Sequence, residues 1–427
     1  MTVLILGSFI IGYLAIAFEH PIGLNKAASA LITGVVCWAI YILYADDTDA
    51  VNHALNEHLG GIAEILFFLL GAMTIVELID GHDGFDVITS KIKTNNKVRL
   101  IWILSLLSFI LSAILDNLTT AIVMVSLVRK MIWDKQLRLL SAGMIVIAAN
   151  SGGAWSPIGD VTTTMLWIGG QVTSAKLLGH VLLPSIASLL VPLSVISLRL
   201  RGDLPIEEPS LRKEDRPTTP KRDRNIVFYS GLLLLIMVPV FKSVTHLPPY
   251  MGMLLGLGLI WIVTEMLHRD KDEQDKSFFS VMYAIRKIDT PSILFFLGIL
   301  LSVSALESLG LLNAAAARLD TFFEDDTLIV GLIGLLSSIV DNVPLVAAAI
   351  GMYPLEQHAP DDPFWHLLAY CSGTGGSILI IGSAAGIAAM GIEKIQFIWY
   401  LKKIAWLALL GYFAGIVVFL VQQQLGF

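Results

Sequence analysis

The chain carries little charge: Lys, Arg, Asp and Glu make up only 15% of its 427 residues. Soluble domains contain about 25% charged residues, so the composition excludes a soluble enzyme and a nucleic-acid-binding protein. Cysteine is nearly absent, and Cys37 and Cys371 both lie in apolar runs, which excludes a secreted disulfide scaffold. The nine His are scattered singly, without the spacing typical of a metal site. With no nucleotide-binding motif or nucleophile–base pair either, we expect no enzyme activity and no cofactor.

Apolar residues are abundant instead, at 56% of the chain with a mean hydropathy of +0.76. Runs near 20 apolar residues match the length of a bilayer-spanning helix, and they lack the short alternation of a membrane β-barrel. The sequence therefore predicts an all-α polytopic membrane protein. The first run lacks the basic start of a signal peptide, so we interpret it as a span; its removal is the alternative. The runs are 2–18, 27–45, 61–79, 100–128, 139–170, 177–198, 226–241, 250–267, 291–311, 327–354, 364–392 and 404–421.

The distribution of Lys and Arg indicates which side each run faces, because basic loops stay in the cytoplasm. The run 100–128 is flanked by basic residues at both ends, whereas 327–354 is flanked by acidic residues at both ends. We therefore predict that these two runs are re-entrant hairpins, that the other ten runs cross, and that both termini lie outside. This arrangement puts 25 of the 28 Lys and Arg, Lys26 among them, on the cytoplasmic side. The alternative for 100–128 is a single tilted helix of 29 residues.

The chain divides near its middle at segment 200–224, which is rich in Pro and charge and which we interpret as a cytoplasmic linker. The halves 1–199 and 225–427 share a motif, Ser-x-x-x-Asp-Asn, at 112–117 and again at 337–342. About 34 residues later, both halves carry a Gly-Gly pair and a further Gly. Each half has five spans and one hairpin, and because five is odd, we predict two repeats of inverted topology.

Each half also contains an interrupted helix, in 139–170 and in 364–392. The stretch 150–160 contains Pro157 and three Gly, so it cannot continue as one helix. We expect the partner break to run from Ser372 to Gly376 and again around Gly382. Glycine in membrane helices can simply allow close packing, but we interpret the paired breaks as a midplane site, since paired broken helices in inverted repeats are typical of secondary transporters.

Asp116 and Asp341 lie midway along their apolar runs, and no Lys or Arg occurs within about 12 residues of either. A carboxylate at membrane depth costs from about 2.5 kcal/mol upward and is functional by default. With no local partner, we expect its compensating charge to be a mobile cation or a proton. Removal from water disfavours the charged carboxylate, so one group can hold either the proton or the ion. This predicts exchange.

Further side-chain oxygens near these aspartates suit a hard cation such as Na⁺. We predict a Na⁺ site at Asp116, Asn117, Asp341 and Asn342, assisted by Thr119, Thr120 and, in the first break, Asn150 and Ser151. For Asp160, with Thr162 and Thr163 behind it, a helix N-cap and a direct ion role are equally weighted interpretations. Glu77 and His82 are candidates for pH sensing, although a solvated helix end explains them more simply.

At these motifs the sequence resembles the NhaD-type sodium/proton antiporters of the ion transporter superfamily, over essentially the whole chain. The resemblance implies a bacterial inner-membrane protein, surrounded by lipid and assembled as a homodimer, that exports Na⁺ and Li⁺ in exchange for H⁺. It maps the polar site onto Asp116, Asn117, Asn150, Asp160, Thr162, Thr163, Ser337, Asp341 and Asn342, and more loosely onto Thr374 and Ser377.

Two other functions remain as alternatives. A Na⁺- or H⁺-coupled carrier of a small anion (dicarboxylate, sulfate or arsenite) shares the superfamily layout, but related dicarboxylate carriers have Ser-Asn-Thr at the hairpin tips, where this chain has Asp-Asn. Two buried carboxylates would repel an anion. A membrane enzyme, or a subunit of a larger complex, leaves the inverted repeat unexplained.

Overall fold

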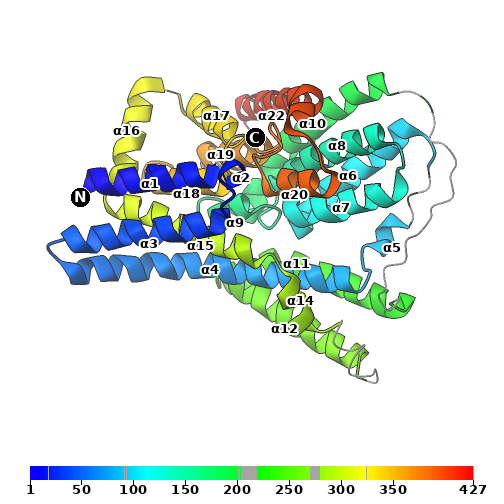
Figure 1. Ribbon diagram of the computed structural model, residues 1–427, viewed down its shortest axis with the longest axis horizontal. Coiled ribbons are helices and arrows are strands. Elements are labelled where there is room, and N and C mark those ends of the chain that lie inside the picture. Colours follow the sequence, from blue (N-terminus) through cyan, green and yellow to red (C-terminus); the bar gives the residue numbers. More distant parts are fainter. Residues whose placement is uncertain are drawn as a thin grey trace.

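The computed structural model describes residues 1–17, 19–90, 92, 94–200, 202, 219–269, 279–323 and 325–426. Within these ranges every helix or strand element is a helix (Figure 1), which confirms the all-α prediction. Eight helical stretches are long and apolar enough to cross a membrane: α3 (Lys26–Tyr44), α4 (Thr48–Gly81), α6 (Lys97–Leu115), α10 (Ser174–Arg199), α11 (Lys221–Thr245), α12 (Pro249–Leu267), α15 (Thr290–Ser308) and the joined stretch Phe397–Gln424.

The other elements are shorter or more polar. α1 (Thr2–Ala17) is apolar but only 16 residues long. The remaining short ones outside the hairpins and interrupted helices are α2 (Glu19–Ile22), α5 (Asp86–Thr89), α14 (Val281–Lys287), α16 (Leu311–Phe323), and, within the last stretch, α21 (Phe397–Tyr400), the π-helix η1 (Leu401–Ala405) and α22 (Trp406–Gln424).

The run 100–128 folds as a hairpin. α6 ends just before Asp116, and α7 (Asn117–Met131) begins just after it. The Ser112 hydroxyl donates to the Ala149 carbonyl oxygen at 2.6 Å, so the end of α6 lies beside the end of α8 (Lys135–Gly153). α7 finishes only a few residues before α8 starts and packs along it. α7 therefore runs back beside α8, and the single tilted helix is wrong.

The run 327–354 forms the matching hairpin from α17 (Asp326–Leu336) and α18 (Asn342–Met352). The Ser337 hydroxyl donates to the Ser372 carbonyl oxygen at 2.8 Å, near the end of α19 (Pro363–Gly375). The ring of Tyr353, just after α18, lies 4.7 Å from the ring of Phe364, at the start of α19. α18 thus returns to the end at which α17 began.

Both predicted helix interruptions are present. α8 breaks off after Gly153 and α9 (Val161–Ile168) resumes in its place, while α19 is followed after a gap by α20 (Ala384–Glu393). The breaks begin later than we expected, because 150–153 and 372–375 are still helical. Glycine weakens a helix only modestly, and tertiary packing sustains these last turns.

The helix packing repeats crosswise between the halves, as an inverted repeat requires. α3 packs on α15 as α12 packs on α4, α1 packs on α3 as α11 packs on α12, and α6 packs on α8 as α17 packs on α19. The helices fall into two groups. We call α1, α3, α4, α11, α12 and α15 the frame, and the two hairpins, the two interrupted helices, α10 and α22 the core group (Figure 1).

Several boundaries differ from the predicted ones. α4 begins at Thr48, so the acidic segment 46–60 is mostly helical and α4 is about 51 Å long, well beyond a bilayer core of about 30 Å. α16, which runs across the direction of α1 and α3 (Figure 1), has no counterpart among the predicted spans. In the linker, 201 and 203–218 lie outside the described residues, and α11 already begins at Lys221.

Candidate functional site

Four helix N-termini meet at the centre of the core group. α7, α9, α18 and α20 each follow an interruption, and each is capped by the residue before it. Each capping side chain accepts a hydrogen bond from a backbone N–H two or three residues later, as small polar caps do. The caps are Asp116, Asp160, Asp341 and Ser383. Asp116 and Asp341 are repeat mates, as are Asp160 and Ser383.

A pocket opens where these N-termini meet the frame. α4 supplies the largest share of its apolar lining, with Phe296 of α15 and single residues from the four capped helices. Its polar lining consists of Lys26, Asp116, Asn117, Asp160, Thr164, Ser292, Asp341 and Asn342. Three carboxylates and one ammonium group therefore face one pocket. The sequence predicted the carboxylates and the two Asn, but not the lysine.

Asp160 lies at the centre of the hydrogen-bond network. Asn117 Nδ2 donates to Asp160 Oδ2 at 2.6 Å, and Asn342 Nδ2 lies 3.3 Å from both Asp160 carboxylate oxygens. The Thr162 N–H and hydroxyl both donate to Asp160 Oδ1 at 3.0 Å. Asp160, only 2% exposed, is thus an N-cap and also, within the described part of the chain, the one carboxylate that binds an amide from each hairpin tip.

Asp116 is held by its own helix. Asp116 Oδ1 accepts from the Thr119 N–H and Oδ2 accepts from the Thr119 hydroxyl, both at 2.8 Å. Its backbone has φ 94° and ψ 159°, a region that costs a non-glycine residue about 1–3 kcal/mol. Within the described ranges, neither Asp116 nor Asp160 forms an ion pair with Lys or Arg. Asp116 thus fits the expectation of an aspartate without a resident cation.

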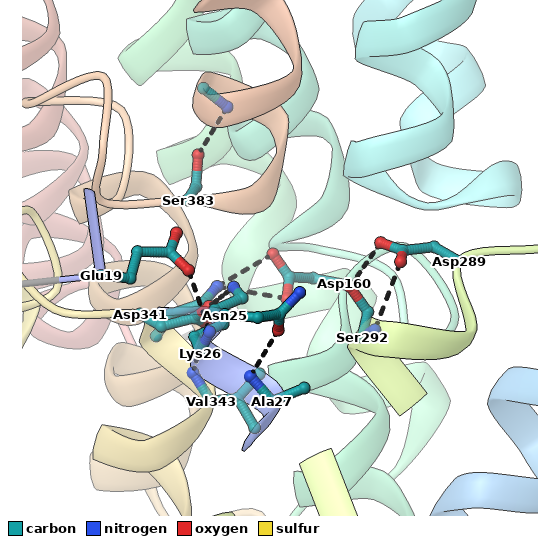
Figure 2. Close-up of polar contacts among 12 residues, drawn as sticks. Glu19, Asn25, Lys26, Ala27, Asp160, Asp289, Ser292, Asp341, Val343 and Ser383 are labelled. Carbon is teal, nitrogen blue, oxygen red and sulfur yellow. Dashed lines mark hydrogen bonds and ion pairs between the residues drawn. The ribbon is translucent and has the colours of Figure 1, made fainter. Parts of the chain in front are cut away.

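Asp341 does not fit that expectation. Lys26 Nζ lies 2.9 Å from Asp341 Oδ2, and Figure 2 shows this pair beside Asp160. The two residues are 315 positions apart in the chain, so a search for nearby cations in the sequence could not find the partner. The expectation that a mobile ion must compensate Asp341 is therefore wrong, and Lys26 lies in the pocket and not in a loop.

The scaffold around the pocket is built twice. The hydroxyls of Ser112 and Ser337 each donate to a carbonyl oxygen near the end of α8 or α19. A side chain on Gly152 would lie 2.2 Å from the Phe109 carbonyl oxygen, and one on Gly375 would lie 1.9 Å from that of Gly334. These glycines therefore do allow close packing of helix against hairpin in both halves, the interpretation that we had set aside for them.

Asn150 links the two interrupted helices. Asn150 Nδ2 donates to the Ser383 hydroxyl at 2.9 Å (Figure 2), and Asn150 Oδ1 accepts from Asn117 Nδ2 at 3.2 Å. Ser383 also accepts from the Gly386 N–H. Ser383, which is not among the predicted site residues, thus joins the network; its position in the repeat, equivalent to that of Asp160, is the signal that could have identified it.

Several predicted site residues point elsewhere. Ser151 accepts from the Ser188 hydroxyl of α10. Thr374 and Ser377 donate to carbonyl oxygens of their own segment, and Thr163 donates to the Asp160 carbonyl oxygen. Thr120 Oγ1 is buried with no hydrogen-bond partner in the described part of the chain. None of these residues lines the pocket.

Glu77 and His82 lie together at the end of α4, away from the pocket lining. Lys287 Nζ lies 3.6 Å from Glu77 Oε1. His82 Nδ1 is 2.7 Å from the Leu78 carbonyl oxygen, and His82 Nε2 is 2.8 Å from His268 Nε2. His82 is therefore a buried, packed side chain and not part of a solvated helix end; a pH-sensing role for it stays a prediction.

Comparison with known proteins places the chain in a family. A family profile described as "Citrate transporter" (CitMHS) matches residues 13–373. Sodium/proton antiporter 1 of Arabidopsis thaliana is 47% identical over 98% of this chain and 72% of that protein. The Na(+)/H(+) antiporter NhaD of Vibrio cholerae is 32% identical over 98% and 91%, and that of Alkalimonas amylolytica is 31% identical over 96% and 89%.

The fold also has a solved relative. The YdaH transporter of Alcanivorax borkumensis, described as having an unusual topology, superposes with a TM-score of 0.58 over 94% of this chain and 97% of that one, at 11% identity. This likeness concerns the fold alone and confirms the polytopic helical architecture. The family profile and the sequence relatives show that the chain belongs to the citrate transporter family and to the NhaD-type sodium/proton antiporters.

Proposed function

We propose that this protein exchanges cytoplasmic Na⁺, and also Li⁺, for external H⁺ at the pocket between the hairpin tips. The observation that supports this most strongly is the charge of the pocket. Three carboxylates face one ammonium group, and two of the carboxylates, Asp116 and Asp160, have no Lys or Arg partner within the described ranges. Such a site attracts small cations, and its relatives carry antiporter names.

The chemistry of exchange follows from competition for one carboxylate. A proton on Asp116 or Asp160 removes the negative charge that a Na⁺ ion needs, and a bound Na⁺ ion disfavours the proton. The amide groups of Asn117 and Asn342, which lie against Asp160, supply neutral oxygen atoms that complete a hard-cation shell. In each transport step, a given carboxylate therefore carries either a Na⁺ ion or a proton across the membrane, and never both.

Alternating access is suggested by one break in the repeat symmetry. α18 packs along α15, whereas its repeat mate α7 makes no comparable contact with α4 among the described residues. The pocket lies between α7 and α4, and Phe68, Leu69 and Leu118 are among the residues that line it. We infer that the outer side is closed and the cytoplasmic side is the open one. Elevator-like or rocking movement of the hairpins against the frame would exchange these two states.

The family profile is described by citrate, so an anion carrier is the second candidate. A multiply charged anion would face three carboxylates, and the ammonium group of Lys26 already binds Asp341. We therefore propose cations as the substrates and expect citrate, sulfate and arsenite not to be transported. Uptake of labelled citrate by the purified protein would reverse this choice.

Other features of the proposal concern its setting. We propose a bacterial inner-membrane location with both termini outside, the linker 200–224 in the cytoplasm between repeats 1–199 and 225–427, and a homodimer surrounded by lipid. We also propose that the protein works without a cofactor, since only the transported ions and the pocket side chains enter the exchange cycle.

Everted membrane vesicles from a host without its own antiporters test the function. Respiration acidifies their interior, and addition of Na⁺ or Li⁺ should then raise the luminal pH. Asp116→Asn should abolish this response, because the pocket loses one of its two carboxylates without a resident cation. Asp320→Asn is the matched control: that carboxylate binds Tyr353 at 2.9 Å, away from the pocket, and its loss should leave exchange unchanged. A full response in Asp116→Asn would refute the site.

A further inference from the structure

The Lys26–Asp341 pair lies at the edge of the proposed ion pocket and is open to it. Lys26 Nζ and Asp341 Oδ2 are 2.9 Å apart, and the side chains are 19% and 13% exposed. Both line the same pocket as Asp116 and Asp160. Complete burial of an ion pair carries a large desolvation penalty. This pair keeps part of its surface open to the pocket and is therefore accessible to an ion that enters it.

The fold holds Lys26 in this position. Lys26 is the first residue of α3, whose cap Asn25 accepts from the Ala27 N–H at 2.8 Å, and its own N–H donates to Glu19 Oε2 at 3.2 Å. Its ammonium group also lies 4.4 Å from the centre of the Phe295 ring. The lysine therefore reaches Asp341 from a fixed point in the frame and not from a free surface loop.

Close packing of α3 on α15 fixes this point. A side chain on Gly298 of α15 would lie 2.4 Å from backbone atoms of Ala30 and Leu31 in α3, so the two helices touch backbone to backbone. α15 in turn packs along α18, at whose start Asp341 lies. The ion pair thus joins a rigid part of the frame to the tip of a hairpin.

The repeat mate of Asp341 has no such partner. Asp116 is satisfied by two hydrogen bonds from Thr119, and α12, the counterpart of α3, begins with Pro249 and Tyr250, which offer no cation. The lysine is therefore an addition to one half only. Hydrogen bonding alone satisfies the equivalent carboxylate, so a lysine is not needed to bury it.

We propose that Lys26 is a specificity-determining residue of the exchange site: its ammonium group occupies Asp341 when no transported cation is bound there, and an incoming Na⁺ ion must displace it to use Asp341 as a ligand. This inference rests on the proposed function. Lys26 is a tethered competitor at high effective concentration, so it weakens the apparent affinity for Na⁺ and excludes cations that cannot compete for the carboxylate. Displacement also releases the hairpin tip from the frame, which links ion binding to movement.

Kinetics in proteoliposomes separate this role from a structural one. In Lys26→Gln the carboxylate of Asp341 has no ammonium partner, so Na⁺ can bind it without displacing the lysine. The apparent KM for Na⁺ should therefore fall about threefold to tenfold. Lys26→Arg should keep the wild-type KM. Asp341→Asn leaves the Lys26 ammonium group unpaired in the pocket, where it repels Na⁺, so the KM of this variant for Na⁺ should rise. The double variant Lys26→Gln, Asp341→Asn lacks that unpaired charge, so its KM should return toward the wild-type value.

Lys287→Gln is the matched control, because Lys287 pairs with Glu77 at 3.6 Å outside the pocket; its KM should not change. If Lys26→Gln does not fold, Lys26→Met, which keeps the apolar stem, takes its place. An unchanged or higher KM in the folded lysine variant, or a double variant no better than Asp341→Asn, would overturn the proposal. Failure of the wild-type protein to exchange Na⁺ would instead overturn the proposed function itself, so the two failures are distinguishable.

Discussion

The two hairpin tips perform the same structural task in different ways. The first turns at Asp116 alone, with that residue in a strained backbone conformation, while the second turns over the five residues from Ser337 to Asp341 without strain at its aspartate. The first aspartate is held by its own Thr119 and the second by Lys26 from another part of the chain. The repeat has therefore kept the scaffold in both halves while the charge of each half diverged.

The interrupted helices differ in the same way. Asp160 and Ser383 both cap the second half of their helix, but only Asp160 brings a charge, and both hairpin Asn donate to it. Ser383 accepts hydrogen bonds from the Asn150 amide and the Gly386 N–H, and it carries no charge. Because three of the four caps are acidic and one is not, the pocket is asymmetric although the fold around it is nearly symmetric.

Among changes to the two interrupted helices, Asp160→Asn should show the largest effect. Loss of the carboxylate that both hairpins share should reduce Na⁺ exchange at least about 100-fold, which corresponds to about 2.8 kcal/mol, measured as ²²Na⁺ flux in proteoliposomes. Ser383→Ala, at the repeat-related position, removes a neutral cap and should cost less than about tenfold. Equal losses in the two variants would contradict the asymmetry of the pocket.

Gly375→Ala and Gly152→Ala test the scaffold that the two halves share. Their expected effect, on the free energy of unfolding, is smaller than the loss of exchange expected for Asp160→Asn. In each, the new methyl group would meet a hairpin carbonyl oxygen, and such overpacking costs about 1–3 kcal/mol. Both variants should lower the unfolding temperature in detergent by similar amounts. Gly258→Ala, in open space on α12, is the control and should not. A large loss in one half only would show that the scaffold is less symmetric than it looks.

The sequence predicts much of this fold because its signals are local. The acidic and basic flanks of two apolar runs are enough to predict the hairpins, and Pro157 with its neighbouring glycines is enough to predict the first interruption. The positions of Asp116, Asn117 and Asn342 in the pocket follow from the motif shared by the halves. These features depend on residues a few positions apart.

What the sequence does not reveal depends on contacts between distant segments. The cation that pairs with Asp341 is in α3, 315 positions away in the chain, so the residues near Asp341 in the sequence do not indicate it. The carbonyl oxygens that the glycine pairs contact belong to other helices, so the sequence around the glycines does not reveal their close packing. The extension of α4 back to Thr48 also went unpredicted, since polar residues there indicate exposure to water and say little about whether the backbone is helical.

The central claim is that Na⁺ and protons compete for the carboxylates of one pocket. The most direct test is the apparent KM for Na⁺ of the wild-type protein in proteoliposomes, measured over a range of pH at a clamped membrane potential. Competition predicts that KM rises as pH falls, approaching tenfold per pH unit for each competing proton, while the maximal rate at saturating Na⁺ changes much less. A KM that is independent of pH, with only the maximal rate varying, would contradict the account.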